Sequence, residues 1–448
     1  MSDEYWDEDL DTKPWVEVLA WQRTQLASFV TRLAERSPFF ADRLEGVQVS
    51  GDFDANEWAE IPYTTKDDLR AGQGGEASDN LLGFLQCVDN SEVVQVLASS
   101  GTTGRPVYFG LTDGDRAAWA DSIANMFYTA GIRPSSVVAL TTGMPLVAGG
   151  TPYADAVRRI GATLVWVGGQ TMARTVSIVA DLKVDTLIGT ASFATFFAER
   201  CEAVTGRPAS DLAIRTVIGG GEPGMGQEAI RSRIRDAWNA ERVSEVMGLG
   251  DVMSGLWGEC SEGNGMHFTA SRNVYVELID PESGELVDWT AGASGEAVYT
   301  PFTREASPTL RFRSRDHLQV MAVSCRCGRT APVVRCVGRT DDMLIFKAMN
   351  VFPSAIRDIV MEGFASQIAG PLRVRKDRID QVRFDDPIPL EVELPDGISP
   401  TDAGDLGWRM EEAVRERLRV RVAVELLERG AIPVGEYKNA LTYVRERS

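Results

Sequence analysis

The chain has 448 residues, of which 44% are hydrophobic and 25% charged, as in an ordinary globular protein. Its formal net charge of −19 argues against a nucleic-acid partner, because nucleic-acid binders normally carry a basic face. No apolar run approaches the roughly 18 residues that cross a bilayer. The start, MSDEYWDEDLDTKPW, lacks the basic and apolar regions of a signal peptide. These features predict a cytoplasmic protein with neither a membrane nor a nucleic-acid partner.

The numbers of cysteines and histidines limit the possible disulfide bonds and catalytic bases. Six cysteines in a cytosolic chain of this length do not suggest a disulfide framework. The two histidines are His267 and His317. A mechanism that needs a histidine base therefore has two candidates.

The first half of the chain changes from helical to alternating patterning. Residues 16–44 carry apolar side chains at helical spacing, and Ile-Pro-Tyr-Thr-Thr at 61–65 is typical of a turn. From about residue 93 to 221, short β-branched runs alternate with amphipathic helical stretches. This alternation predicts βαβ units and a mainly parallel sheet. The runs are 137–140, 162–167, 185–190 and 216–221.

The pattern changes again between residues 274 and 323, where shorter runs are split by turns such as Pro-Glu-Ser-Gly. Residues 273–280, 295–300 and 317–323 predict antiparallel strands, arranged as a distorted β-barrel beside the sheet. A domain boundary is expected at residues 338–342. The unit after it has strand and helix patterns of its own and a common domain size. The predicted strands are 343–348, 389–394 and a final one, and the predicted helices start at Ser354 and span 401–418.

The sharpest motif is Ala-Ser-Ser-Gly-Thr-Thr-Gly-Arg-Pro at 98–106, directly after the strand-like run 93–97. Two glycines allow a tight backbone turn, and four hydroxyls can donate to phosphate oxygens. Exposed N–H groups of such a loop form an anion-binding concavity. The loop lacks the Gly-x-x-x-x-Gly-Lys-Ser/Thr spacing of the Walker P-loop. A polar surface loop is the alternative, but the strand, hydroxyls, glycines and basic residue together favour a phosphate site.

This loop resembles the phosphate loop of the adenylate-forming superfamily of acyl-CoA synthetases. More narrowly, the chain resembles the phenylacetate–CoA ligase family over nearly its full length. The segments that carry the resemblance, in chain order, are 99–106, 161–171, 219–224, 247–260, 311–316, 338–356 and 433–444.

The resemblance implies an α/β fold with a large N-terminal domain at 1–338 and a small, mobile α+β lid at 342–448, hinged at 339–341. ATP, Mg²⁺ and coenzyme A are the implied cofactors. Lys438, Thr102 and Asp251 would be catalytic, with Asp251 holding Mg²⁺ and Lys438 reaching the α-phosphate from the lid. The implied nucleotide-binding residues are Ser99, Ser100, Gly101, Thr102, Thr103, Gly104, Gly221, Glu222, Pro223, Met247, Gly248, Asp316 and Arg339.

Two of these roles have plain structural alternatives. Asp316 could form a salt bridge to Arg311, Arg313 or Arg315, which is common on surfaces. Lys438 could be a solvated surface lysine, the default for any lysine.

Three segments depart from the family pattern. The motif Tyr-Gly-x-Ser/Thr-Glu reads Met-Gly-Leu-Gly-Asp at 247–251, so the magnesium carboxylate is one methylene shorter. The usual Arg-Gly is Lys347-Ala348, where the added methyl could interfere with pantetheine. The usual Glu after Phe-Pro-x-x-Ile is Arg357. Acid activation is therefore a firmer expectation than thioester formation.

A metal site is expected from four residues. Cys260, His267, Cys325 and Cys327 offer three thiolates and an imidazole, a common set for a closed structural Zn²⁺ site. Buried free cysteines are the alternative, and some family members resemble this arrangement with bound zinc. The remaining cysteines, Cys87, Cys201 and Cys336, are expected in the core.

The resemblance places the acid between the phosphate loop and the segments around Phe127, Tyr128, Met144, Gly219 and Gly220. An apolar, aromatic lining suits a flat aryl acid, although ordinary core packing explains each apolar side chain equally well.

The expected reaction has two steps. A small, aromatic carboxylic acid and Mg·ATP give the acyl-AMP and pyrophosphate, and a thiol, most often coenzyme A, then captures the acyl group. The alternative acceptors are an amine, a carrier-protein thiol, or an aromatic amine after diazotase-type activation of nitrite. A nucleotide-binding protein without turnover is a third reading. A homodimer is the default expectation for assembly.

Overall fold

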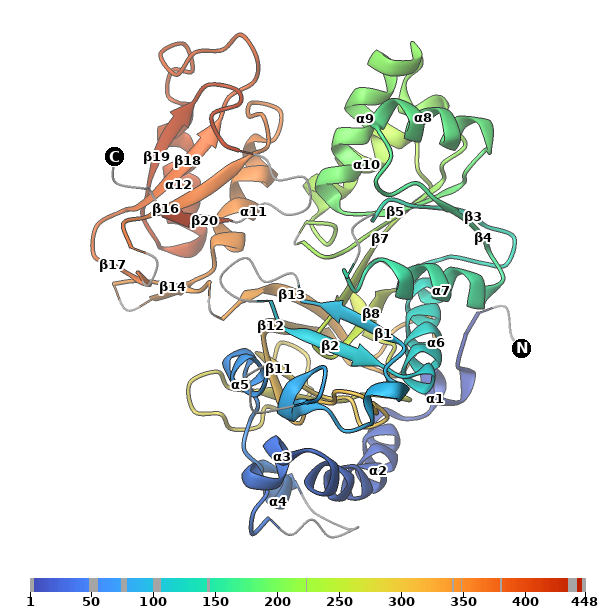
Figure 1. Cartoon of the computed structure of the whole chain (residues 1–448). Coiled ribbons are helices and arrows are strands. Elements are labelled where there is room, and N and C mark those ends of the chain that lie inside the picture. The colour runs from blue at the N-terminus through green and yellow to red at the C-terminus, as the bar shows by residue number, and fades with distance from the viewer. Residues whose placement is uncertain are drawn as a thin grey trace.

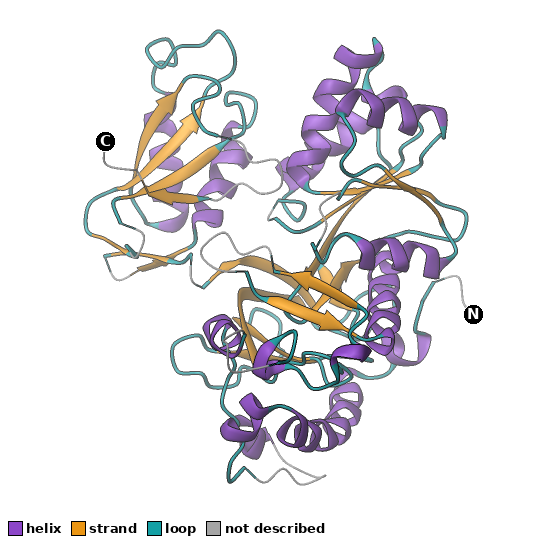
Figure 2. Cartoon of the chain, viewed as in Figure 1, coloured by secondary structure: helices purple, strands orange, loops and turns teal. Residues whose placement is uncertain are grey.

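The computed structural model describes residues 4–47, 55–73, 79–99, 106–142, 146–222, 224–340, 342–347, 349–378, 381–433 and 441–444. Figure 1 shows that the C-terminal strands β16, β18, β19 and β20 form a lobe beside the rest of the chain, and Figure 2 shows helices and strands mixed throughout. The predicted α/β class is confirmed.

The helices in the described residues are α1 (Glu8–Thr12), α2 (Trp15–Arg36), α3 (Pro38–Arg43), α4 (Ala55–Ala59), α5 (Lys66–Gly72), α6 (Asp113–Thr129), α7 (Thr151–Ile160), α8 (Met172–Asp181), α9 (Ala191–Thr205), α10 (Glu228–Trp238), α11 (Pro353–Phe364) and α12 (Leu406–Leu418). The strands are β1 (Gln95–Ala98), β2 (Tyr108–Leu111), β3 (Val137–Leu140), β4 (Thr163–Trp166), β5 (Thr186–Gly189), β6 (Thr216–Gly219), β7 (Arg242–Leu249), β8 (Met253–Glu259), β9 (Met266–Phe268), β10 (Tyr275–Ile279), β11 (Ser294–Thr300), β12 (Phe312–Ala322), β13 (Val333–Arg339), β14 (Leu344–Phe346), β15 (Met349–Val351), β16 (Leu372–Lys376), β17 (Arg383–Phe384), β18 (Ile388–Glu393), β19 (Val422–Leu427) and β20 (Thr442–Val444).

The helical pattern predicted for residues 16–44 is two helices rather than one. Ser37 ends α2 and caps α3, because its side chain accepts a hydrogen bond from Phe40 N. Pro38 occupies the first turn of α3, where its missing N–H costs nothing. The turn predicted at 61–65 is followed by α5, whose first residue is Lys66.

The central feature is an eleven-stranded sheet in the order β10-β11-β12-β13-β9-β8-β7-β6-β5-β3-β4. The strands predicted from residues 137–221 are β4, β3, β5 and β6 of its parallel part, and β7, which was not predicted, pairs parallel with β6. The strands predicted at 273–323 are β10, β11 and β12, and they pair antiparallel as expected. The described strands do not close into the expected barrel, because the antiparallel strands continue the parallel sheet through the β7–β8 pairing instead.

The C-terminal part has separate small sheets. β19-β18-β16-β20 form one sheet and β15-β14-β17 form another. Their apolar side chains make a cluster of their own with α11 and α12, against which Ala229 and Ile230 of α10 also pack. The helix expected from 401 begins at Leu406, since residues 401–405 form turns. Strand β16 was not predicted.

None of the helices in the described part of the chain is long and apolar enough to cross a membrane.

Candidate nucleotide site and metal cluster

The base of the predicted phosphate loop is closed by Ser99. Its N–H donates to Val107 O at 2.8 Å, and its Oγ accepts from Val107 N at 3.2 Å. The Ser99 hydroxyl therefore joins the two ends of the loop. The loop residues Ser100, Gly101, Thr102, Thr103 and Gly104 lie outside the described residues.

The turn between β7 and β8 brings Met247, Gly248 and Asp251 together. Gly248 lies so close to β8 that a Cβ on it would be 2.2 Å from the Ser254 carbonyl group. Only glycine fits there without moving the hairpin. The Asp251 carboxylate is buried, and its Oδ2 lies 3.2 Å from Lys66 Nζ. Sequence analysis did not single out Lys66, because a lysine carries no signal until the fold supplies its partner.

The buried Arg304 connects this turn to the strand that follows the phosphate loop. Its guanidinium donates to the carbonyls of Asp251 and Val252, and to Gly110 O of β2 at 3.4 Å. Asp251 is thus held at a fixed place relative to β2, next to the exit of the loop.

Asp316 and Arg339 lie opposite one another on β12 and β13. Their side chains form an ion pair at 3.5 Å, with Asp316 largely buried and Arg339 partly exposed. The alternative partners of Asp316 are used elsewhere. Arg311 pairs with Glu277, while Arg313 and Arg315 pair with Glu296.

The segment after β6 holds the third group of predicted nucleotide residues. A Cβ on Gly220 would lie 2.3 Å from Val246 O, so glycine lets β6 approach β7 closely as the parallel strands end. Glu222 follows the exposed Gly221 and accepts a hydrogen bond from Ser192 N, in the first turn of α9, at 2.6 Å. Pro223 lies outside the described residues.

The two aromatic residues predicted for the acid pocket face different surroundings. Phe127 packs edge-on against Tyr153, with ring centroids 4.9 Å apart. Tyr128 instead contacts Trp6 and lies 3.8 Å from the Arg133 guanidinium carbon. Consecutive residues of α6 point about 100° apart, so Phe127 and Tyr128 cannot share one face. Met144 lies outside the described residues, and a Cβ on Gly219 would meet Met225.

Tyr153 was missed by sequence reasoning. It lies on α7 and donates to Ser254 O at 3.2 Å, the same carbonyl that Gly248 approaches closely. Gly149 is its neighbour, with a Cβ position 3.7 Å from the Tyr153 ring. The only prior signal was an aromatic residue two positions after a Gly-Gly-Thr turn.

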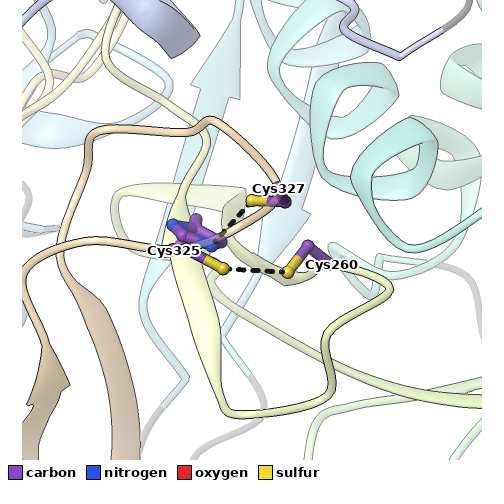
Figure 3. Close-up of side chains that lie close together, drawn as sticks. Cys260, Cys325 and Cys327 are labelled. Carbon is purple, nitrogen blue, oxygen red and sulfur yellow. Dashed lines mark hydrogen bonds between the residues drawn. The ribbon is translucent and has the colours of Figure 1, made fainter.

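The four predicted metal ligands converge. The ligand atoms of Cys260, His267, Cys325 and Cys327 all lie within 4.8 Å of one another. Cys260 Sγ is 3.7 Å from Cys325 Sγ, and Cys327 Sγ is 3.4 Å from His267 Nε2. Figure 3 shows Cys260 on one loop facing Cys325 and Cys327 on another.

These positions fit a tetrahedral zinc ion. Zn–S bonds of about 2.3 Å place two sulfurs of a tetrahedron about 3.8 Å apart, which matches the Cys260–Cys325 separation. His267 Nδ1 lies 2.9 Å from Ala331 O, and this contact leaves Nε2 directed at the cluster. A hydrogen bond with Cys260, and then the nearby His267, lower the pKa of the Cys327 thiol, while the same hydrogen bond and burial raise the pKa of Cys260.

The remaining predicted residues have simpler places. Cys87 and Cys201 are buried in hydrophobic clusters, and Cys336 packs against one. His317, the other histidine, bonds Ser294 Oγ through Nε2 at 2.7 Å. Lys438 lies outside the described residues.

No protein-family model matches the chain. Among curated proteins, phenylacetate-coenzyme A ligase of Thermus thermophilus is 31% identical over 361 residues, which cover 79% of this chain and 77% of that protein. The enzyme of the same name from Escherichia coli is 31% identical over 353 residues, covering 77% and 76%. That of Pseudomonas putida is 33% identical over 307 residues, covering 68% and 66%.

Solved structures show the same fold. 2-Hydroxyisobutyryl-CoA ligase in a postadenylation state superimposes with a TM-score of 0.84 at 24% identity, covering 97% of this chain and 91% of that one. In its thioesterification state the same ligase gives a TM-score of 0.69 at 25% identity, covering 99% and 93%.

The sequence identity extends over more than three quarters of both chains for two of these curated ligases. The fold agrees with that of a ligase that forms an acyl-AMP. This chain belongs to the phenylacetate–CoA ligase family of ATP-dependent, AMP-forming ligases.

Proposed function

We propose that this protein activates a small aromatic carboxylic acid with Mg·ATP and transfers the acyl group to coenzyme A. The observation that carries the proposal is the identity of about 31% to curated phenylacetate-coenzyme A ligases over most of both chains. The aromatic character of the acid is proposed from this similarity alone, because Phe127 is fully buried against Tyr153 in the hydrophobic core.

In the first step a carboxylate oxygen of the acid attacks the α-phosphorus of ATP. The bond from that phosphorus to pyrophosphate breaks, and pyrophosphate leaves with the electron pair. In the second step the sulfur of coenzyme A attacks the acyl carbon, the thiol proton goes to solvent or base, and AMP leaves. Bound magnesium would neutralise phosphate charge in the first step.

The residues proposed for these steps come from three elements. Asp316 can accept hydrogen bonds from the ribose hydroxyls, with Arg339 beside it on β13. Asp251, held by Lys66 and Arg304, offers the carboxylate for magnesium. We assign Lys438 to the α-phosphate, as a cation that stabilises charge in the transition state.

We further propose that residues 342–448 act as a lid hinged at 339–341. The support is the separate apolar cluster formed by α11, α12 and the sheets around β14 and β18. A unit with its own core can change its orientation without unfolding.

The test is acid-dependent release of pyrophosphate from Mg·ATP across a panel of aryl and alkyl acids, with and without coenzyme A. Release with aryl acids, accompanied by a coenzyme A thioester in the product, is the expected result. Release without thioester would redirect the acceptor to an amine, a carrier-protein thiol or nitrite chemistry. No release with any acid would contradict the proposed activation.

We propose that the cluster of Cys260, His267, Cys325 and Cys327 holds a structural zinc ion. Four protein ligands leave no open position for a substrate, so the ion would fasten two loops rather than take part in the reaction.

Cys325→Ser tests this site. Bound zinc should fall from about one ion per chain towards zero, and the thermal midpoint should drop, because metal-binding energy contributes to folding. Cys201→Ser, in a core without these ligands, is the matched control and should keep its zinc. Equal zinc content in the Cys325→Ser and wild-type proteins would refute the metal assignment.

A further inference from the structure

Lys66 is held in place by two elements. Thr65 caps α5 in a capping box, in which its side chain accepts from Asp68 N and Asp68 accepts from Thr65 N. Thr64 forms a parallel bridge to Phe312, with its backbone bonded to Arg311 O and Arg313 N. The backbone at Lys66, the first residue of α5, is therefore fixed by the helix cap on one side and by the bridge to β12 on the other.

The side chain of Lys66 reaches one buried carboxylate. Its Nζ lies 3.2 Å from Asp251 Oδ2, and the two side chains are 30% and 7% exposed. The other oxygen, Asp251 Oδ1, is buried and has no hydrogen-bond partner in the described part of the chain. A buried, ionised oxygen left without a partner is costly unless a ligand completes it.

The far end of α5 reaches the phosphate loop. Gln73 follows the helix, and its side-chain amide brackets Tyr108 by accepting from Tyr108 N and donating to Tyr108 O. Tyr108 begins β2, two residues after the loop motif ends. One short helix thus joins the exit of the loop to the carboxylate on the β7–β8 turn.

We propose that Lys66 is a positioning residue for Asp251 in the nucleotide site, an inference that rests on the proposed function. It holds Oδ2 in an ion pair and leaves Oδ1 as the oxygen open to the divalent cation. Its charge also neutralises Asp251 when no cation is bound, so that the carboxylate does not repel the triphosphate.

Charge balance explains why this role matters. Without Lys66, a largely buried carboxylate would face the phosphates of ATP without its ion-pair partner. Like charges in a partly dry site repel strongly. Arg304 offsets only part of this charge, because it lies near Asp251 but donates to the backbone carbonyls of Asp251 and Val252 rather than to the carboxylate. A divalent cation on Asp251 would remove most of the repulsion.

The test compares ATP binding to the full chain in excess Mg²⁺ and in EDTA, by calorimetry, for four variants. Lys66→Met should weaken ATP binding in EDTA by about tenfold or more. About tenfold is the minimum loss of affinity expected when a largely buried carboxylate loses its ion-pair partner. Its loss in Mg²⁺ should be clearly smaller. Lys66→Met combined with Asp251→Asn should regain binding in EDTA, because the uncompensated charge is gone. Lys66→Arg should stay near wild type.

Lys13→Met is the matched control. Lys13 also forms an ion pair, with Asp9, and its side chain is 32% exposed. Both of its affinities should equal those of wild type, and thermal midpoints should confirm that every variant is folded.

Three results would overturn the role of Lys66: no loss of EDTA binding in Lys66→Met, an equal loss in both buffers, or no recovery of EDTA binding in the double variant. A wild-type protein that binds no ATP in either buffer would overturn the proposed nucleotide site itself. If the wild type releases pyrophosphate in an acid-dependent way and Lys66→Met binds ATP in EDTA as tightly as wild type, only the positioning role of Lys66 is overturned.

Discussion

At the scale of single residues, β12 is organised by arginine–carboxylate pairs. Arg311 is fully buried and donates to both oxygens of Glu277, and its guanidinium also bonds the carbonyls of Ala59 and Ile61. Arg313 bonds both oxygens of the buried Glu296. Planar guanidinium groups suit such paired contacts. With these arginines engaged, Asp316 pairs across to Arg339.

Arg311→Met should destabilise the protein by about 3–5 kcal/mol, because it leaves Glu277 buried and unpaired. Urea unfolding measures the change. Arg315→Met is the matched control, since Arg315 is 37% exposed and lies 3.6 Å from Glu296; it should cost less than about 1 kcal/mol. A double variant, Arg311→Met with Glu277→Gln, should recover part of the loss. Equal costs for the two single variants would contradict this account.

Glu245 should make stability depend on pH. Burial, and then repulsion from Glu259, raise the pKa of Glu245 to about 7 from an ordinary value of 4.5. Because the folded state then binds the proton more tightly than the unfolded state, this group stabilises the fold below about pH 4.5. That contribution is lost as the pH rises to about 7.

Glu245→Gln should remove this loss. The variant should match wild type near pH 5 and exceed it at pH 8, by an amount on the order of 1 kcal/mol. The free energy of unfolding in urea at pH 5, 6 and 8 provides the measurement. A wild-type-like fall in stability between pH 5 and 8 in the variant would rule out Glu245 as its source.

At the scale of elements, the β7–β8 hairpin positions Asp251, the carboxylate proposed to hold magnesium. Both strands are paired on their outer sides, β7 with β6 and β8 with β9, so the hairpin cannot shift freely. The close approach of Gly248 to Ser254 sets how tightly the strands cross before the turn at Asp251. A change at Gly248 should therefore be felt at Asp251.

Gly248→Ala should destabilise the hairpin by about 1–3 kcal/mol through overpacking and weaken Mg·ATP binding. Gly363→Ala makes the same chemical change on α11, where a Cβ meets nothing within 4 Å. It should stabilise the protein by about 0.5–1 kcal/mol, because alanine favours helix. Thermal unfolding and calorimetry distinguish the two. A Gly248→Ala protein that is more stable than wild type and binds Mg·ATP normally would show that Gly248 and Ser254 lie farther apart in solution.

At the scale of the whole molecule, the C-terminal part rests on α10 and β13 through α11. Gln227, just before α10, donates to Asp358 of α11, and Arg357 pairs with the same carboxylate at 2.9 Å. Burial raises the pKa of Asp358, while Arg357 lowers it. Arg357 stands where the family pattern usually has Glu, and it forms an ion pair with the neighbouring Asp358.

If residues 342–448 move as proposed, Asp358→Ala should weaken this docked arrangement by about 1 kcal/mol, the worth of a typical hydrogen bond. Small-angle scattering should then show a larger mean radius of gyration. Glu362→Ala is the control on the same helix, because Glu362 pairs with Arg417 within the C-terminal part. Identical scattering from all three proteins would indicate that this contact does not hold the arrangement.

Local pattern was enough to locate many strands and the cysteines of the candidate metal cluster. The runs at 137–140 and 216–221 became β3 and β6 because β-branched residues between helical segments suit buried parallel strands. The Cys-x-Cys turn at 325–327 placed two thiolates on one loop, and Cys260 and His267 completed the cluster. Strand β16 escaped prediction because alternating arginines, Arg373 and Arg375, masked its apolar face.

The amino-acid sequence by itself determined the family, the α/β class and the order of the motifs, since these depend on residue types at short spacings. Tertiary structure alone decided the pairings across more than a hundred residues, such as Lys66 with Asp251 and Gln227 with Asp358. It also decided that the antiparallel strands extend one sheet rather than close a barrel. The reason is physical: a charge or a strand edge has no preferred partner until burial excludes water and leaves one neighbour within reach.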